Sequence, residues 1–223
     1  MTTPQRVETP IVPKGQPREV IVLLDTSGSM EWEAADGSPI TRWQVISEAM
    51  PLFVSALEAE DSAAVEEQAS GSDEKGGLLI HGFSNLHTEL GDFNSSNFGR
   101  KWPQIQVGGG TTIMPAWRAA QEDYMEEFGD IDAMDRPALL TLVITDGEAT
   151  DAAEFGEVLK NAKTGRYFAV AIVGHGEDHD KTLRSYQDAT QSNPKHVTVV
   201  SFDSVTNPRD LASDLIVLAG LGE

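Results

Sequence analysis

The sequence contains no cysteine and few basic residues. Without cysteine, the 223-residue chain has no disulfide, no thiolate nucleophile and no thiolate ligand for zinc or an iron–sulfur cluster. Lysine and arginine total 16 against 36 acidic residues, which gives a formal net charge of −20. Such a surface lacks the positive charge that nucleic-acid phosphates or anionic membranes attract, so we expect neither as a partner.

Long apolar runs are also absent. The first 20 residues, MTTPQRVETPIVPKGQPREV, contain no apolar segment typical of a signal peptide, and no later run approaches the roughly 20 residues of a membrane-spanning helix. We therefore expect a cytoplasmic protein. Residues 1–18 carry four prolines and few apolar side chains, which indicates a flexible N-terminal tail before one folded domain over residues 19–223.

Strand and helix patterns alternate along that domain. Continuous β-branched and aliphatic runs predict buried strands at 19–25, 76–84, 138–146, 166–174 and 196–202. Residues 85–107 are irregular, with a candidate short strand near 87–90. Apolar residues at three- and four-residue steps predict helices at 40–60, 114–129, 152–163, 178–190 and 207–220. This order predicts an α/β fold: a doubly wound, mostly parallel, Rossmann-like sheet with helices on both faces.

Two details qualify the helix predictions. Pro51 lies inside the first predicted helix, where the missing N–H is expected to bend or interrupt it. The segment after that helix, over 62–76, is small, polar and acidic, and we expect a solvated surface loop that extends the helix at its start.

The first predicted strand ends in side chains that carry oxygen. Asp25 closes the strand, and Ser27 and Ser29 follow at alternate positions, which point the same way in an extended segment. Gly28 lets the backbone wrap closely around a small ligand. Because ligands of open α/β sheets bind beyond the carboxyl ends of the strands, this loop is expected at the functional edge.

Two later loops are predicted at the same edge. Glycines 108–110 lead into Thr111 and Thr112, and Asp146 ends a later strand. The three loops together offer aspartate carboxylates and serine or threonine hydroxyls. These hard oxygen ligands suit Mg²⁺, with Mn²⁺ or Ca²⁺ as alternatives.

The motifs DTSGSM, GGGTT and TLVITDGEATD, in this order and spacing, resemble those of the von Willebrand factor A (vWA) domain. The resemblance covers roughly residues 19–221. In that family the motifs form the metal-ion-dependent adhesion site, and a carboxylate from a protein partner often completes the shell of the metal. The resemblance thus implies capture of an Asp or Glu side chain of a protein partner through a bound cation.

The same resemblance implies a role for each ligand. Ser27, Ser29 and Thr111 would touch the metal directly, with Thr111 preferred to its neighbour because the family's threonine directly follows the glycines. Asp25 and Asp146 would act through water.

Other interpretations of the motifs are weaker. Asp25 could simply cap the following helix. Phosphatases with an aspartate nucleophile resemble Asp-x-Asp-x-Thr/Val at such a strand end, and here Ser27 replaces the second carboxylate. A serine nucleophile would need a basic partner; His81, near the end of a predicted buried strand, is the candidate at the edge, and a structural role at the strand end is the simpler interpretation.

We therefore expect a protein-binding module and not an enzyme. The alternatives are a metal-dependent phosphatase or phosphotransfer component, and a structural subunit of a larger assembly. The bare chain resembles stand-alone intracellular bacterial members of the family, which accompany stress-response systems of the tellurite-resistance type or ring-shaped ATPases. The sequence leaves the oligomeric state open.

Overall fold

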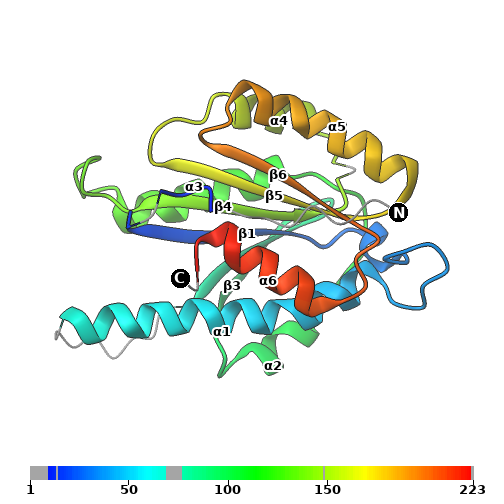
Figure 1. Ribbon diagram of the computed structural model, residues 1–223, viewed down its shortest axis with the longest axis horizontal. Coiled ribbons are helices and arrows are strands. Elements are labelled where there is room, and N and C mark those ends of the chain that lie inside the picture. Colours follow the sequence, from blue (N-terminus) through cyan, green and yellow to red (C-terminus); the bar gives the residue numbers. More distant parts are fainter. Residues whose placement is uncertain (1–9, 14, 69–76, 148, 222–223) are drawn as a thin grey trace.

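The computed structural model describes residues 10–13, 15–68, 77–147 and 149–221. Apart from β2 and β3, which follow one another directly, helices separate the strands along these residues (Figure 1). The strands are β1 (Arg18–Asp25), β2 (Leu78–Phe83), β3 (His87–Phe93), β4 (Ala138–Thr145), β5 (Arg166–Gly174) and β6 (Val197–Asp203). The α-helices are α1 (Arg42–Gln68), α2 (Phe98–Lys101), α3 (Met114–Phe128), α4 (Ala152–Lys160), α5 (Gly176–Ser192) and α6 (Pro208–Ala219). Short 3-10 turns, η1 (Gly28–Glu31) and η2 (Trp102–Gln104), lie in the loops.

The strands form one sheet in the order β3-β2-β1-β4-β5-β6. All neighbours pair in parallel except β2 and β3, which form an antiparallel pair. The predicted α/β, doubly wound and mostly parallel fold is confirmed. From β1 the chain first builds outward through β2 and β3 and then returns to β1's other side with β4. The space beyond the ends of β1 and β4 is therefore the switch point at which such sheets bind ligands.

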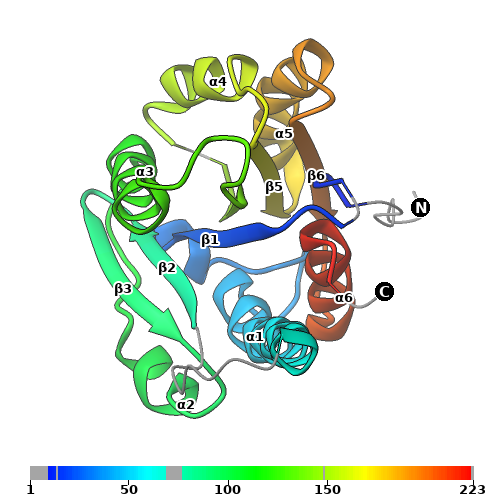
Figure 2. The same ribbon diagram turned by 90° about the vertical axis from the view of Figure 1, so that its left-hand side faces the viewer.

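Helices cover both faces of the sheet (Figure 2). Along β1, Val22 and Leu24 pack into the core under α1 and α6, whereas Ile21 and Leu23 pack into the core under α3, α4 and α5. All four side chains are at most 1% exposed. Each contributes on the order of 2 kcal/mol through burial, which explains why strands buried on both faces read as continuous apolar runs.

The long helix α1 continues through Pro51 without a break (Figure 1). The proline leaves the Ser47 carbonyl without its usual partner, yet Met50 and Phe53 beside it are fully buried and hold the helix on the sheet. The helix extends to Gln68, as expected for the start of the predicted surface loop. The rest of that predicted loop, 69–76, lies outside the described residues.

Part of the predicted flexible tail is also outside the described residues, which begin at Pro10. Within the described part, Val12 is 3% exposed and belongs to the core that includes α6. The Pro17 carbonyl accepts a hydrogen bond from the Ala138 N–H at the start of β4. No helix among the described residues has the length and apolar character needed to cross a membrane.

Candidate metal centre

The two predicted aspartates lie side by side at the carboxyl edge of the sheet. Strand pairing sets Leu24 opposite Ile144, so Asp25 lies next to Thr145 and Asp146. The Thr145 hydroxyl donates a 2.7 Å hydrogen bond to Oδ2 of Asp25. Asp25 is 0% exposed and Asp146 is 2% exposed, so both carboxylates are withdrawn from water.

The first loop places its serines against this pair. The Ser27 N–H donates to Oδ1 of Asp25 at 2.8 Å, which fixes the loop to the strand end. The Ser27 and Ser29 hydroxyl oxygens are 3.0 Å apart. Ser29 lies in the 3-10 turn η1 and not in an extended segment, so the turn after Ser27 brings the two hydroxyls together as a pair of oxygen donors.

The glycine loop packs directly on the serine loop. The Gly108 N–H donates to the Thr26 carbonyl at 2.8 Å, and the Gly28 N–H donates to the Gly109 carbonyl at 3.0 Å. A Cβ on Gly28 would lie 3.4 Å from that same carbonyl oxygen. Gly109 has a φ of +85°, in the left-handed region that favours glycine.

Of the two threonines after the glycines, Thr111 is the one turned inward. Thr111 is 5% exposed, and its carbonyl accepts a 2.9 Å hydrogen bond from the N–H of Thr150. The hydroxyl of Thr112 instead lies 3.3 Å from that of Thr150. The carboxylate of Asp151 accepts hydrogen bonds from the N–H groups of Ile113 and Met114 at the start of α3, which fixes this loop.

One residue of the site was missed from the sequence. Arg42, the first residue of α1, is 7% exposed, and its Nη1 lies 2.7 Å from Oδ2 of Asp146. The same nitrogen lies 3.5 Å from the Ser29 carbonyl. A signal was present in the sequence: Arg42 is the only basic residue between Arg18 and Lys75, in an otherwise acidic and apolar stretch.

Burial and the negative charge of Asp146 disfavour the ionised form of Asp25. Burial, together with the negative charge of Asp146, raises the pKa of Asp25 to about 7, although hydrogen bonds from Ser27 and Thr145 work in the opposite direction. Oδ1 of Asp146 is buried and has no hydrogen-bond partner among the described residues. A divalent cation would favour the ionised form of Asp25 and give this oxygen a partner, so the residues present fit such an ion.

The kind of cation follows from the donor set. Among the described residues, no group of three or more His, Asp or Glu side chains is arranged to hold a metal. A metal at this edge would therefore depend on the serine and threonine hydroxyls as well as on Asp25 and Asp146. Neutral oxygen donors of this kind suit Mg²⁺, Mn²⁺ or Ca²⁺ rather than zinc or copper.

The described histidines form contacts away from the serine hydroxyls. His81, fully buried in β2, contacts His87 at 2.9 Å and Asp123 at 3.0 Å. His179 contacts Ser201 at 2.8 Å. His196 lies 3.2 Å from the carbonyl of Arg166. Among the described residues, no imidazole is hydrogen-bonded to either serine of the site.

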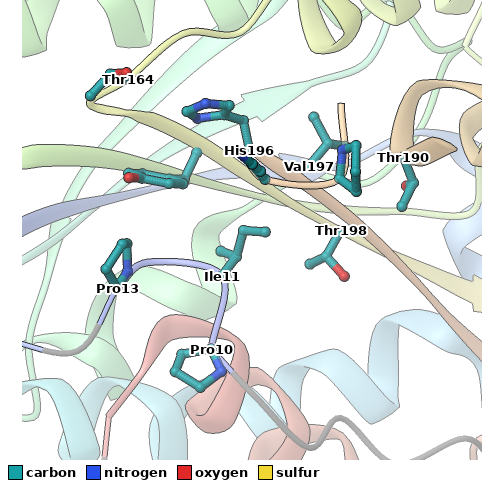
Figure 3. A pocket seen from close by; sticks show the side chains of 11 residues that line it. Pro10, Ile11, Pro13, Thr164, Thr190, His196, Val197 and Thr198 are labelled. Atoms are coloured by element: carbon teal, nitrogen blue, oxygen red, sulfur yellow. The ribbon is translucent and has the colours of Figure 1, made fainter. Parts of the chain in front are cut away.

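Two surface hollows lie at different distances from the candidate metal site. One of about 560 Å³ lies between the β2–β3 turn and residues 104–109, and it shares Thr26, Gly108 and Gly109 with the metal loops. The other, of about 590 Å³, is shown in Figure 3 with Ile11 and His196 among its lining residues. It opens near the starts of β5 and β6, at the sheet edge opposite the aspartates, so only the first hollow adjoins the candidate metal site.

Comparison with known proteins supports the fold. No family model and no curated protein matches the sequence. Among solved structures, the SpRpn10 vWA domain aligns over 93% of this chain and 100% of its own length, with a TM-score of 0.60 and 12% identity. The PilB minor pilin from Streptococcus sanguinis aligns over 91% of this chain with a TM-score of 0.58 and 14% identity. This chain spans 60% of the pilin's length.

A third solved structure also has a similar fold. The manganese-loaded TRAP protein of Plasmodium vivax aligns over 90% of this chain and 72% of its own length, with a TM-score of 0.50 and 18% identity. At such low identities the comparisons establish the fold and nothing finer. The chain has the vWA fold, as the sequence motifs predicted.

Proposed function

We propose that the protein is a divalent-cation-dependent protein-binding module that captures an acidic side chain of a protein partner. One observation carries the proposal. At the switch point of the sheet, two buried aspartates lie beside a pair of serine hydroxyls 3.0 Å apart, and one oxygen of Asp146 has no hydrogen-bond partner among the described residues. Such an arrangement is costly without a cation and favourable with one.

Each residue of the site then has a role. The hydroxyls of Ser27, Ser29 and Thr111 would bind the cation directly, and Asp25 and Asp146 would hold its waters. When bound, the cation supplies an electrophilic position that an external carboxylate can occupy. Mg²⁺ is the default ion, with Mn²⁺ or Ca²⁺ as alternatives; the structural neighbour TRAP was solved loaded with manganese.

The surroundings of the site favour a protein as the carboxylate donor. Trp32 is 52% exposed and Leu86 is 75% exposed, and both belong to loops at the carboxyl edge of the sheet. The hollow next to the glycine loop adds room for side chains that flank the captured residue. Because the chain carries a net charge of −20, the partner would present a single carboxylate on a surface that is otherwise neutral or basic.

Binding without catalysis is supported by what surrounds the serines. A serine nucleophile needs a base within hydrogen-bond reach, and the hydrogen bonds of His81, His87, His179 and His196 go to other groups. An aspartate-based phosphatase needs a second carboxylate at the position of Ser27. The proposed cytoplasmic location, and a place in a stress-response system of the tellurite-resistance type or in an ATPase-associated complex, rest on the resemblance to stand-alone bacterial vWA proteins.

Calorimetric titration with Mg²⁺ tests the site directly. We expect Ser27→Ala to lower the affinity by about tenfold or more, because it removes a direct ligand. Ser192→Ala, an exposed serine on α5 that bonds its own helix, is the matched control and is expected to change nothing. Equal affinities for the wild-type protein and Ser27→Ala would refute the assignment.

Affinity capture from native lysate tests the function itself. We expect a partner that is retained with Mg²⁺, released by a chelator and not retained by Ser27→Ala. Hydrolysis of a phosphomonoester that needs Mg²⁺ and is lost in Asp25→Asn would instead support the enzyme alternative. A partner that stays bound in chelator and on the Ser27→Ala variant would support a structural subunit.

A further inference from the structure

We infer that Arg42 is a positioning residue that sets the charge of the metal site, so that the cation is held firmly only together with an external carboxylate. This inference rests on the proposed function and specifies how the partner is recognised.

The Arg42 guanidinium is enclosed by groups from several loops at the metal edge. The group reaches Asp146 after β4, the Ser29 carbonyl in η1 and the face of Trp32, whose ring centroid is 5.6 Å from Cζ. Gly174, at the end of β5, lies against it, and a Cβ there would come within 2.9 Å of Cζ and Nε. Three separate parts of the chain thus surround one arginine at the metal edge.

Ordinary stabilisation does not explain this arrangement well. A buried ion pair roughly offsets the cost of removing its charges from water. Here the cost is higher, because Nε of Arg42 is buried and has no hydrogen-bond partner among the described residues. Only one carboxylate oxygen of Asp146 has a hydrogen-bond partner: Oδ2 accepts from Arg42, whereas Oδ1 has no partner among the described residues.

The two carboxylate oxygens of Asp146 have different roles in the proposed site. Arg42 holds Oδ2 at 2.7 Å and so restricts the orientation of the carboxylate. Oδ1 remains available for the shell of a cation. Replacing Arg42 would therefore change both the orientation and the charge that the cation meets.

The net charge of the occupied site determines which external ligand it favours. With a divalent cation present, Asp25 and Asp146 contribute two negative charges, and Arg42 adds one positive charge. The sum for Asp25, Asp146, Arg42 and the cation is +1. A residual charge in a buried site is costly, and one carboxylate from a partner brings the sum to zero. Without Arg42 the aspartates alone would balance the cation, and the external carboxylate would lose this advantage.

Calorimetric titration of Mg²⁺ with and without acetate, a minimal carboxylate, tests the inference. In the wild-type protein we expect acetate to raise the Mg²⁺ affinity by about tenfold, the order expected for one unit charge at the edge of a buried site. In Arg42→Met, we expect Mg²⁺ alone to bind about tenfold more tightly than to the wild-type protein, and acetate to add less than about twofold. Arg42→Lys keeps the charge and is expected to restore the effect of acetate.

Arg18→Met is the matched control. Arg18 forms a 2.7 Å ion pair with Glu60 at the other end of β1, so its loss should leave both titrations as in the wild-type protein. Equal Mg²⁺ affinities for Arg42→Met and the wild-type protein, or an acetate effect that survives in Arg42→Met, would overturn the inference.

The wild-type titration also separates the two proposals. If Mg²⁺ does not bind at all, the proposed function fails. If Mg²⁺ binds but acetate has no effect, the metal site stands and the role of Arg42 is refuted, even where the variants do not fold.

Discussion

The stability of the metal-free protein should depend on pH through Asp25. In the unfolded chain this carboxyl ionises near its ordinary pKa of 3.8, whereas burial and Asp146 raise its pKa to about 7 in the folded protein. Between these values the folded state binds more protons, so the free energy of unfolding falls as pH rises. The contribution is fully present below pH 3.8 and is lost as pH rises through about 7.

The size of the effect follows from the same values. At about 1.4 kcal/mol per pH unit, the gap between 3.8 and about 7 corresponds to about 4 kcal/mol. Asp25→Asn behaves as the protonated form at every pH, and its amide can still accept from the Ser27 N–H. We therefore expect Asp25→Asn to be more stable than the wild-type protein by about 2 kcal/mol at pH 5 and by about 4 kcal/mol at pH 8.

Urea unfolding in chelator from pH 5 to pH 8 measures this difference. Comparison with the variant cancels the contributions of the other acidic residues, and Asp188→Asn, an exposed aspartate on α5, controls for the charge change alone. Bound Mg²⁺ should remove the advantage of the variant, because the cation favours the ionised form of Asp25. A difference between wild type and Asp25→Asn that stays constant across this pH range would refute the reasoning.

Three further substitutions test particular contacts. Thr111→Ala should lower the Mg²⁺ affinity by about tenfold in calorimetry, whereas Thr112→Ala should change it less than about twofold. Gly174→Ala should lower the unfolding free energy by about 1–3 kcal/mol, because its Cβ would meet the guanidinium of the site; Gly165→Ala, also at positive φ but in open space, should cost less, and equal losses would contradict the contact. Pro51→Ala should raise the thermal unfolding midpoint by restoring an N–H inside α1, and an unchanged or lower midpoint would show that the proline costs the helix nothing.

The strands and the positions of the two aspartates could be predicted from short stretches of the sequence. Continuous apolar runs identified β1, β4 and β5 because these strands are almost wholly buried on both faces, and the strand-end position of Asp25 and Asp146 placed both at one edge. Ser27 and Ser29 were expected to point the same way in an extended segment; their hydroxyls do lie together, but a 3-10 turn brings them there. The strand signals depend on the composition of short segments, which a single sequence displays.

Features that join distant segments could not be predicted in the same way. The contact between Arg42 and Asp146 spans 104 residues and depends on where α1 begins relative to the end of β4. The hydroxyl of Thr145, which binds Asp25, was hidden within an apolar strand. The length of β3 was underestimated because its side chains are mostly only partly buried or exposed, and the apolar pattern is correspondingly weak.

A crystal structure of the protein grown with Mn²⁺, with anomalous scattering recorded at the manganese edge, tests the metal site most directly. The predicted result is one strong anomalous peak within direct coordination distance of the Ser27 and Ser29 hydroxyls, with Asp25 and Asp146 reaching the ion through waters. Occupied manganese elsewhere on the chain, with no peak at these serines, would contradict it.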